Sequence, residues 1–254
     1  MPHRMRRPLI LLLPLLAALA VAPLRADRLA RTFLEAGGKP LVEHGTPVVN
    51  GCAGGQIHDD GVPENGYGWN NTVVDGRYVD RFTPASYPFR YGTVCLCWVR
   101  QGSDDTIAYD VVAYDDDGPS GTPGTLLGSV PAVASGVPTA LPGAFYTVDL
   151  STVTANVTSG SIYLGARWNA SVEQGFYLCA DESSATPLAG GEAWSNVAPW
   201  VQTTTLFPNY RALQVQAGEG TALIEVPTLD HVGLAALLAA LAASALFLLR
   251  RRTA

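Results

Sequence analysis

The strongest constraint on this fold is a pair of charge-free apolar segments, one near each end of the chain. The first runs from Leu9 to Leu24 and follows three arginines in the first seven residues. The second runs from Val232 to Leu249 and precedes Arg250–Arg252. Only the roughly 200 residues between these segments remain to form a globular body, which is about the size of one domain.

Residues 1–26 have the three parts of an export signal. A positive stretch precedes the apolar core, and Leu24-Arg25-Ala26 places a small residue before the expected cleavage point. Pro14 and Pro23 argue against a lasting membrane helix, because each removes a backbone donor. We expect this segment to be removed, with an uncut N-terminal anchor as the alternative.

The apolar run near the C-terminus has the length of a membrane span. Its 18 uncharged residues would form a helix about 27 Å long at ~1.5 Å per residue, enough to cross a hydrocarbon core. The arginines behind it would stay in the cytoplasm and place the body on the far side of the membrane. A buried core helix is the alternative, but the run lacks the polar stripe of such a helix.

A short proline motif, one apolar helix and a terminal arginine cluster together resemble the PEP-CTERM class of bacterial sorting tails. The most similar type is IPTL-CTERM, with the pattern Ile-Pro-Thr-Leu, two residues, Trp-Gly; here Val226 replaces Ile and Val232 replaces Trp. The residues at the motif positions are Val226, Pro227, Thr228, Leu229 and Gly233, of which all but Val226 are identical to the pattern. The resemblance covers residues 226–254. It implies that a membrane-embedded sorting enzyme cuts near the motif and passes the body outward; the alternative is a tail that stays as an anchor.

The segments between the two ends divide by composition into an N-terminal extension (27–46), a β-sandwich domain (47–218) and a spacer (219–225). The whole chain has 16 basic and 22 acidic residues. Seven of the arginines but only one acid lie in the two terminal segments, which leaves nine basic and 21 acidic residues and a net charge of −12. Nucleic acid is therefore excluded as a partner, since binding it requires a basic face.

All four cysteines, Cys52, Cys95, Cys97 and Cys179, lie in the exported body. An even number in an oxidising compartment predicts two disulfides. Cys95 and Cys97 are two apart in a strand-like run, so they share a face with Cα atoms nearly ~7 Å apart, which disfavours a mutual bond. We expect each to bond to Cys52 or Cys179, with the partner left open. A zinc site is the alternative, but the chain has no CxxC pair.

Short β-type runs separated by Gly, Pro, Asp and Ser predict an all-β body, a β-sandwich or jelly roll. The segments 81–89 and 115–124 resemble secreted bacterial β-sandwich modules. We also expect a short helix at Leu29–Glu35, a loop over 115–143, and water-exposed Gln214 and Gln216. The expected strands are 77–82, 94–99, 106–114, 144–150, 161–168, 175–179 and 210–215.

Two sets of residues are candidates for ligand binding. Asp115, Asp116 and Asp117 could coordinate calcium, or they could cap backbone amides in a hairpin loop. Trp69, Trp194 and Trp200 lie among turn residues and could form an exposed platform for sugar rings. Trp98 and Trp168, by contrast, lie in strand-like runs, where we expect core packing.

No motif in the chain indicates catalysis. It lacks a Gly-x-Ser-x-Gly elbow, an HExxH motif and a phosphate-binding glycine loop. Paired carboxylates for glycoside hydrolysis cannot be recognised from sequence. The leading hypothesis is a non-enzymatic cell-surface or extracellular-matrix protein without a cofactor. The alternative is a carbohydrate-binding module whose loop tryptophans contact an envelope polysaccharide.

Overall fold

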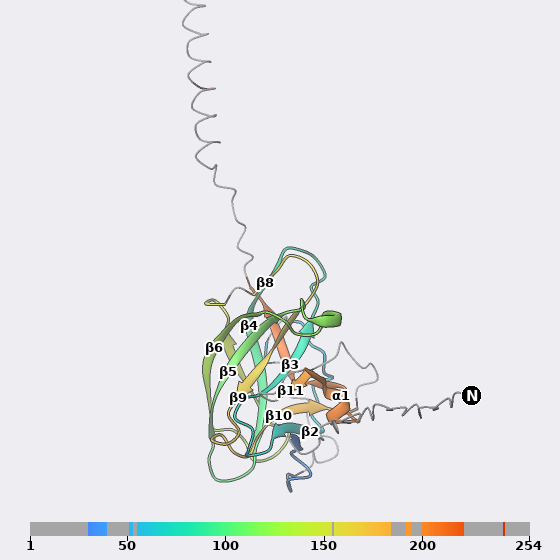
Figure 1. Ribbon diagram of the computed structural model, residues 1–254. Coiled ribbons are helices and arrows are strands. Elements are labelled where there is room, and N and C mark those ends of the chain that lie inside the picture. The colour runs from blue at the N-terminus through green and yellow to red at the C-terminus, as the bar shows by residue number, and fades with distance from the viewer. Residues whose placement is uncertain are drawn as a thin grey trace, which may run out of the picture.

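The computed structural model describes residues 30–39, 51–52, 55–153, 155–183, 192–194, 200–220 and the single position 241. These residues form two antiparallel β-sheets and very little helix (Figure 1), which confirms the all-β prediction. The predicted export signal and sorting tail lie outside the described residues, apart from that one position. Within the described part of the chain, no helix has the length and apolar character needed to cross a membrane.

The first sheet has the strand order β1-β2-β10-β4-β14, with three short additions. β13 pairs with β10, and β7 and β8 pair with β4. The strands are β1 (Ala30–Thr32), β2 (Asn65–Trp69), β4 (Phe89–Arg100), β7 (Ala144–Asp149), β8 (Asn156–Val157), β10 (Phe176–Asp181), β13 (Ala212–Leu213) and β14 (Val215–Glu219).

The second sheet has the strand order β12-β11-β3-β9-β5-β6. A 3-10 turn (Pro119–Gly121) follows β5, and the four-residue helix α1 (Thr203–Leu206) follows β12. The strands are β3 (Gly76–Phe82), β5 (Thr106–Asp115), β6 (Leu126–Ser135), β9 (Ile162–Trp168), β11 (Glu192–Trp194) and β12 (Val201–Gln202).

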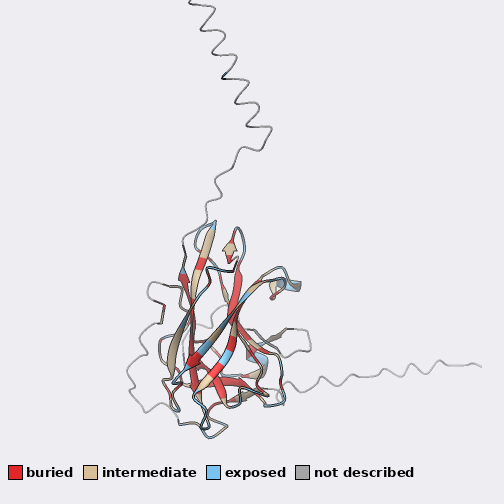
Figure 2. Cartoon of the chain, turned by 90° about the vertical axis from the view of Figure 1, so that its left-hand side faces the viewer, coloured by how far each residue is buried: buried red, intermediate tan, exposed pale blue. Residues whose placement is uncertain are grey.

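The two sheets pack around one aromatic core, and buried residues follow the strands (Figure 2). Trp98 of β4 is completely buried and meets Tyr109 of β5 and Trp168 of β9, with ring centroids 5.2 and 5.1 Å apart. Trp98 comes from the first sheet and its two partners from the second, so these rings join the layers. The predicted core positions of Trp98 and Trp168 are confirmed.

The C-terminal strand lies between β10 and β4, at the point where these neighbours separate. β10 and β4 pair directly as far as Leu178 and Trp98. One residue further on, the Gln214 amide donates to the Cys179 carbonyl (2.9 Å), and the Cys97 amide donates to the Gln214 carbonyl (3.1 Å). β14 then continues along β4, from Val215 opposite Leu96 to Glu219 opposite Tyr91.

Two disulfides reinforce this sheet, as the sequence predicts. Cys52 bonds to Cys95, with Cα atoms 5.6 Å apart, and Cys97 bonds to Cys179, with Cα atoms 5.3 Å apart. The second disulfide spans the point where β10 and β4 separate. Its cysteines pack with Val99 and Tyr177 in a small apolar cluster outside the main core.

Three local predictions are wrong. Residues 30–32 form strand β1 and residues 33–37 a turn, where a helix was expected. The middle of the expected loop at 115–143 is the ten-residue strand β6. Gln214 and Gln216 have no exposed surface, because the outer face of the first sheet is covered; the Cys52 amide, for example, donates to Gln216 Oε1 (3.3 Å).

Removal of the Cys97–Cys179 disulfide should destabilise the body strongly. The bond closes a loop with a sequence separation of 82 residues, so the double variant Cys97→Ala/Cys179→Ala should lower the free energy of unfolding by about 3–5 kcal/mol. Urea unfolding of wild type and variant provides the measurement. Peptide mapping without reduction should recover the Cys52–Cys95 pair in both proteins, and a Cys52–Cys97 peptide from wild type would contradict the structure.

Replacement of Gln214 by methionine should stabilise the protein. Both amide atoms of this buried side chain lack a hydrogen-bond partner in the part of the chain that is described, and an unsatisfied buried polar group costs about 1–3 kcal/mol. Methionine has a similar shape without that cost. Gln214→Met should raise the unfolding midpoint by a few degrees, whereas Gln216→Met, which loses a hydrogen bond, should not.

Candidate functional site

The three consecutive aspartates at the end of β5 act as caps of backbone amides. Asp116 Oδ2 accepts from the Ser161 amide (2.8 Å). Asp117 accepts from the amide and the hydroxyl of Thr125, both at 2.6 Å. The carboxylates are thus directed at different parts of the chain. This geometry matches the capping interpretation of Asp115–Asp117 more closely than a shared calcium site.

The predicted platform of Trp69, Trp194 and Trp200 does not form as expected. Trp69 belongs to β2 and is 4% exposed, stacked on Tyr78 with ring centroids 4.5 Å apart, so its assignment as an exposed ligand-binding residue is wrong. Trp200 is half-buried against Tyr114 (5.2 Å, edge to face). Trp194 belongs to β11, and its side chain is not among those that the structure describes. The Trp69 ring packs in the interior of the sandwich directly against Gly76, which has no side chain to block it.

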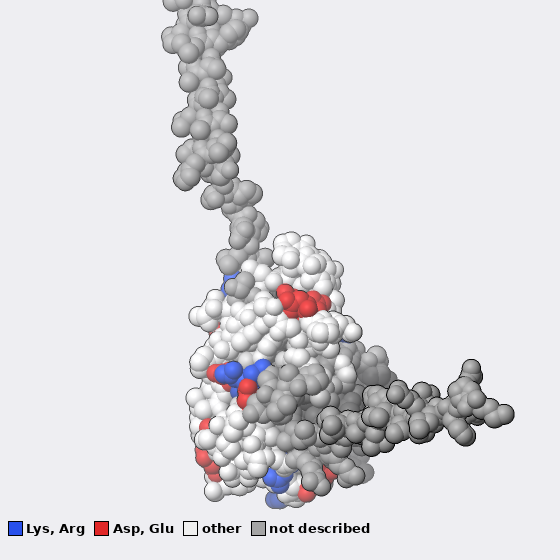
Figure 3. Space-filling view, in the orientation of Figure 1, with Lys and Arg blue, Asp and Glu red and all other residues white. Residues whose placement is uncertain are grey.

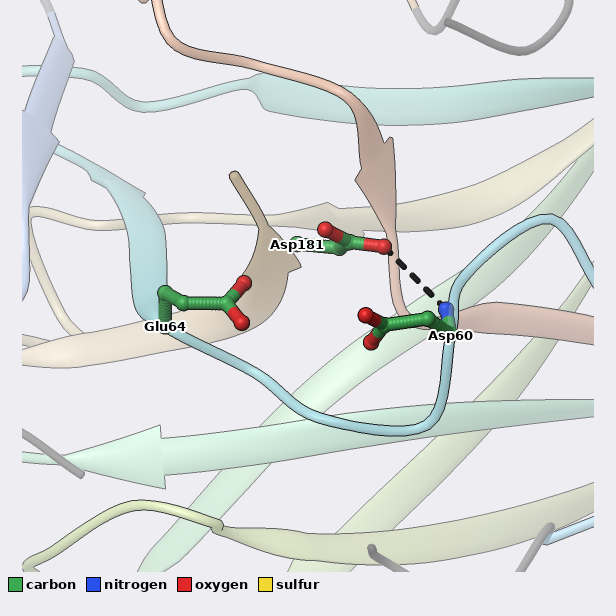
Figure 4. Close-up of side chains that lie close together, drawn as sticks. All are labelled: Asp60, Glu64 and Asp181. Atoms are coloured by element: carbon green, nitrogen blue, oxygen red, sulfur yellow. Dashed lines mark hydrogen bonds between the residues drawn. The ribbon is translucent and has the colours of Figure 1, made fainter. Parts of the chain in front are cut away.

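A different acidic group comes together at the end of β10. One carboxylate oxygen each from Asp60, Glu64 and Asp181 lies within 4.8 Å of the others (Figure 4). Asp60 and Glu64 come from the segment before β2, and Asp181 is the last residue of β10. Oxygen atoms at this spacing are of the kind that can hold a divalent cation. The sequence pattern did not predict this acidic group because Asp181 is 121 residues from Asp60 along the chain.

Hydrogen bonds within the protein explain this clustering. The Asp60 amide donates to Asp181 Oδ2 (3.1 Å), and the Ser183 amide donates to Asp181 Oδ1 (2.8 Å). The Glu182 amide and the Ser183 hydroxyl donate to the two oxygens of Glu64 (2.8 and 2.7 Å). The carboxylates therefore fasten the 60–64 segment to the end of β10. Burial, followed by the nearby charges of Asp181 and Asp60, raises the pKa of Glu64.

The carboxylic acid with the most strongly shifted pKa, Asp80, is buried between the two sheets. Asp80 of β3 is 1% exposed, and the Tyr210 hydroxyl donates to its Oδ1 at 2.7 Å. Burial raises the pKa of Asp80 to about 7, and the Asp59 charge adds to this effect, whereas the Tyr210 hydrogen bond and the Leu213 amide oppose it. Asp80 is thus a buried acid that changes charge near neutral pH. Its contacts connect the second sheet to the C-terminal segment.

The pKa of the nearby His58 is shifted in the opposite direction. His58 is stacked on Phe82 with ring centroids 4.6 Å apart, and 7% of its surface is exposed. Burial, followed by the Arg81 charge, lowers the pKa of His58 to about 4. The imidazole is therefore neutral at physiological pH. Its Nε2 lies 3.4 Å from Gln56 Nε2, and its aromatic contact makes it part of the packing.

Comparison with protein-family models, with characterised proteins and with solved structures finds no match for this chain.

Asp80 should make the protein less stable as pH rises through 7. Its folded pKa of about 7 exceeds the unfolded value of about 3.9, so the stability from the extra proton bound in the folded state is lost as pH rises from about 4 through 7. The contribution of Asp80 to the free energy of unfolding should fall by about 0.8 kcal/mol between pH 6.5 and 8.5. His58 opposes part of this fall, by about 0.4 kcal/mol, because half of its unfolded form is still protonated at pH 6.5 whereas its folded form, with a pKa of about 4, is neutral.

Thermal unfolding of Asp80→Asn across the same pH range tests this assignment. Asparagine still accepts from Tyr210 but does not ionise, so the decline should largely disappear. Asp104→Asn, which changes an exposed acid, is the matched control and should keep the wild-type slope. An unchanged slope in Asp80→Asn would assign the pH dependence to another group.

Proposed function

We propose that this chain is a non-enzymatic protein of the bacterial cell envelope or extracellular matrix, exported and then displayed or released through its C-terminal tail. The observation that carries the proposal is the pair of disulfides, Cys52–Cys95 and Cys97–Cys179. Disulfides form and persist in oxidising compartments outside the cytoplasm. They agree with the export signal expected at residues 1–26.

The position of β14, the last strand among the described residues, supports sorting through the tail. β14 ends at Glu219, and the motif Val226-Pro227-Thr228-Leu229 begins seven residues later. Cleavage within the motif would therefore leave every strand of the two sheets intact. We propose a membrane-embedded sorting enzyme as the partner that cuts there. If the tail is not cut, its apolar helix would anchor the same body to the membrane.

The hydrogen bonds that the acidic groups accept support a structural or interaction role. The carboxylates at 115–117 and at Asp60, Glu64 and Asp181 accept hydrogen bonds from the protein itself. His58 is buried against Phe82. These groups stabilise loops and packing, and we propose that the body acts by display and contact with its surroundings.

The intact mass of the protein recovered from membrane, cell-surface and medium fractions tests this proposal. A mass that begins at Asp27 and ends between Val226 and Leu229, found at the surface or in the medium, is the expected result. A mass that extends through Ala254 and occurs only in membranes would contradict sorting and leave a simple single-span anchor.

Two variants sharpen the measurement. Pro227→Ala/Thr228→Ala changes the motif and should leave the full tail attached in the membrane fraction. Thr221→Ala lies in the spacer and should be processed like wild type. Equal processing of both variants would show that cleavage does not depend on the motif.

A further inference from the structure

The outer face of the second sheet has a hollow of about 630 Å³ over β5, β6 and β9, a volume in the range of small-molecule sites. Strand register places its lining on one face. Ala108 lies opposite Val133, and Asp110 lies opposite both Arg167 and Pro131. Directly opposed residues point to the same side of a sheet. The hollow exists because exposed Ala108 is small and its neighbours are large.

The polar part of the hollow is a network of two arginines and two aspartates. Arg167 donates from Nε and Nη2 to Asp110 Oδ2 at 3.1 and 2.6 Å. Asp75 pairs with Arg77 at 2.6 Å and with Arg167 at 3.9 Å. Figure 3, drawn from this side, shows acidic and basic side chains together in one patch. The two positive and two negative charges cancel, so the hollow has no excess charge to attract an ion.

This network leaves a donor and an acceptor available. Within the described part of the chain, Arg167 Nη1 and Asp110 Oδ1 have no hydrogen-bond partner, since both bonds of the pair go to Asp110 Oδ2. Both residues line the hollow, and their side chains are 35% and 25% exposed, so solvent reaches the ion pair. A ligand hydroxyl can accept from one and donate to the other.

The walls of the hollow are apolar and exposed. Val133 is 63% and Val74 50% exposed, although both are large hydrophobic residues. Pro131 and Ala108 are also exposed and line the same space. Pro131 lies in the middle of the edge strand β6 and has no amide to donate, so it disfavours addition of a partner strand along this edge.

We propose that this hollow binds a neutral saccharide unit of an extracellular polysaccharide. A sugar ring has hydroxyls that both donate and accept, which suits the Arg167–Asp110 pair, and a C–H face, which suits Val133 and Pro131. A charged ligand would lack a compensating charge, and a peptide strand would meet Pro131. The site differs from the tryptophan platform expected from sequence, and its ligand need not depend on whether the tail is cut.

Affinity electrophoresis of the protein purified from cells tests the proposal. The probes are native gels containing dextran, a soluble β-glucan or a galactomannan, with alginate as the anionic comparison. We expect at least one neutral polysaccharide to retard the wild-type protein, and alginate not to. Lack of retardation by all three neutral polysaccharides would overturn the proposal.

Two variants test whether the polysaccharide binds in this hollow. Ala108→Trp fills the hollow from an exposed position and should raise the dissociation constant by at least ~10-fold, or about 1.4 kcal/mol. Ser159→Trp adds the same side chain to a separate hollow of about 250 Å³ beside Asp115–Asp117 and should bind like wild type. Retardation lost in Ser159→Trp but kept in Ala108→Trp would overturn the assignment.

A third variant tests the charge argument without adding bulk. Asp110→Asn keeps an oxygen for Arg167 but leaves the network with one excess positive charge. Its retardation by the neutral polysaccharide should weaken, and alginate should now retard it. If Asp110→Asn behaves like wild type with every probe, the Arg167–Asp110 pair does not contact the ligand and the proposed site is wrong. Intact disulfides and an unchanged far-ultraviolet circular dichroism spectrum confirm that each variant is folded.

Discussion

The insertion of the C-terminal strand between β10 and β4 is the contact on which the rest of the body depends. β10 and β4 pair for only three residues before they separate. Beyond that point, β13 and β14 supply the hydrogen bonds that each of these strands would otherwise lack. A gap there would leave buried backbone groups without partners, each at a cost of about 1–3 kcal/mol. The Cys97–Cys179 disulfide holds the two strands together where the gap begins.

The same segment also connects the two layers. Leu213, Val215 and Ala217 point into the shared core, and the Tyr210 hydroxyl reaches Asp80 on the opposite sheet at 2.7 Å. The first sheet is therefore complete only when residues up to Glu219 are in place. Because the predicted membrane segment begins at Val232, the body would finish folding close to the membrane while the tail is still attached. This order of folding is compatible with the proposed removal of the tail after export.

Sequence patterns predicted the parts of the fold in which local chemistry and burial agree. Six strands and the pairing of Cys95 and Cys97 with distant cysteines were predicted, because alternation and strand geometry are local properties. The seventh expected strand, 210–215, is instead divided between β13 and β14. β6 was missed because Gly128 and Pro131 are typical of loops, although an edge strand tolerates both. Trp69 was misassigned because every residue of β2 is buried, which removes the alternation, and the adjacent glycines resembled a turn. The Asp60–Asp181 contact required the tertiary fold.

The two outer faces of the sandwich differ in a way that limits where a partner can bind. On the first sheet, the two disulfides and the Phe33 turn cover the surface and bury even Gln214 and Gln216. On the second sheet, Trp200 packs against a cluster with Tyr114, Val79 and Val112. The cover does not extend over Val133 and Val74, which stay exposed. The hollow that these two residues line is therefore the part of the second sheet at which we propose that a ligand binds.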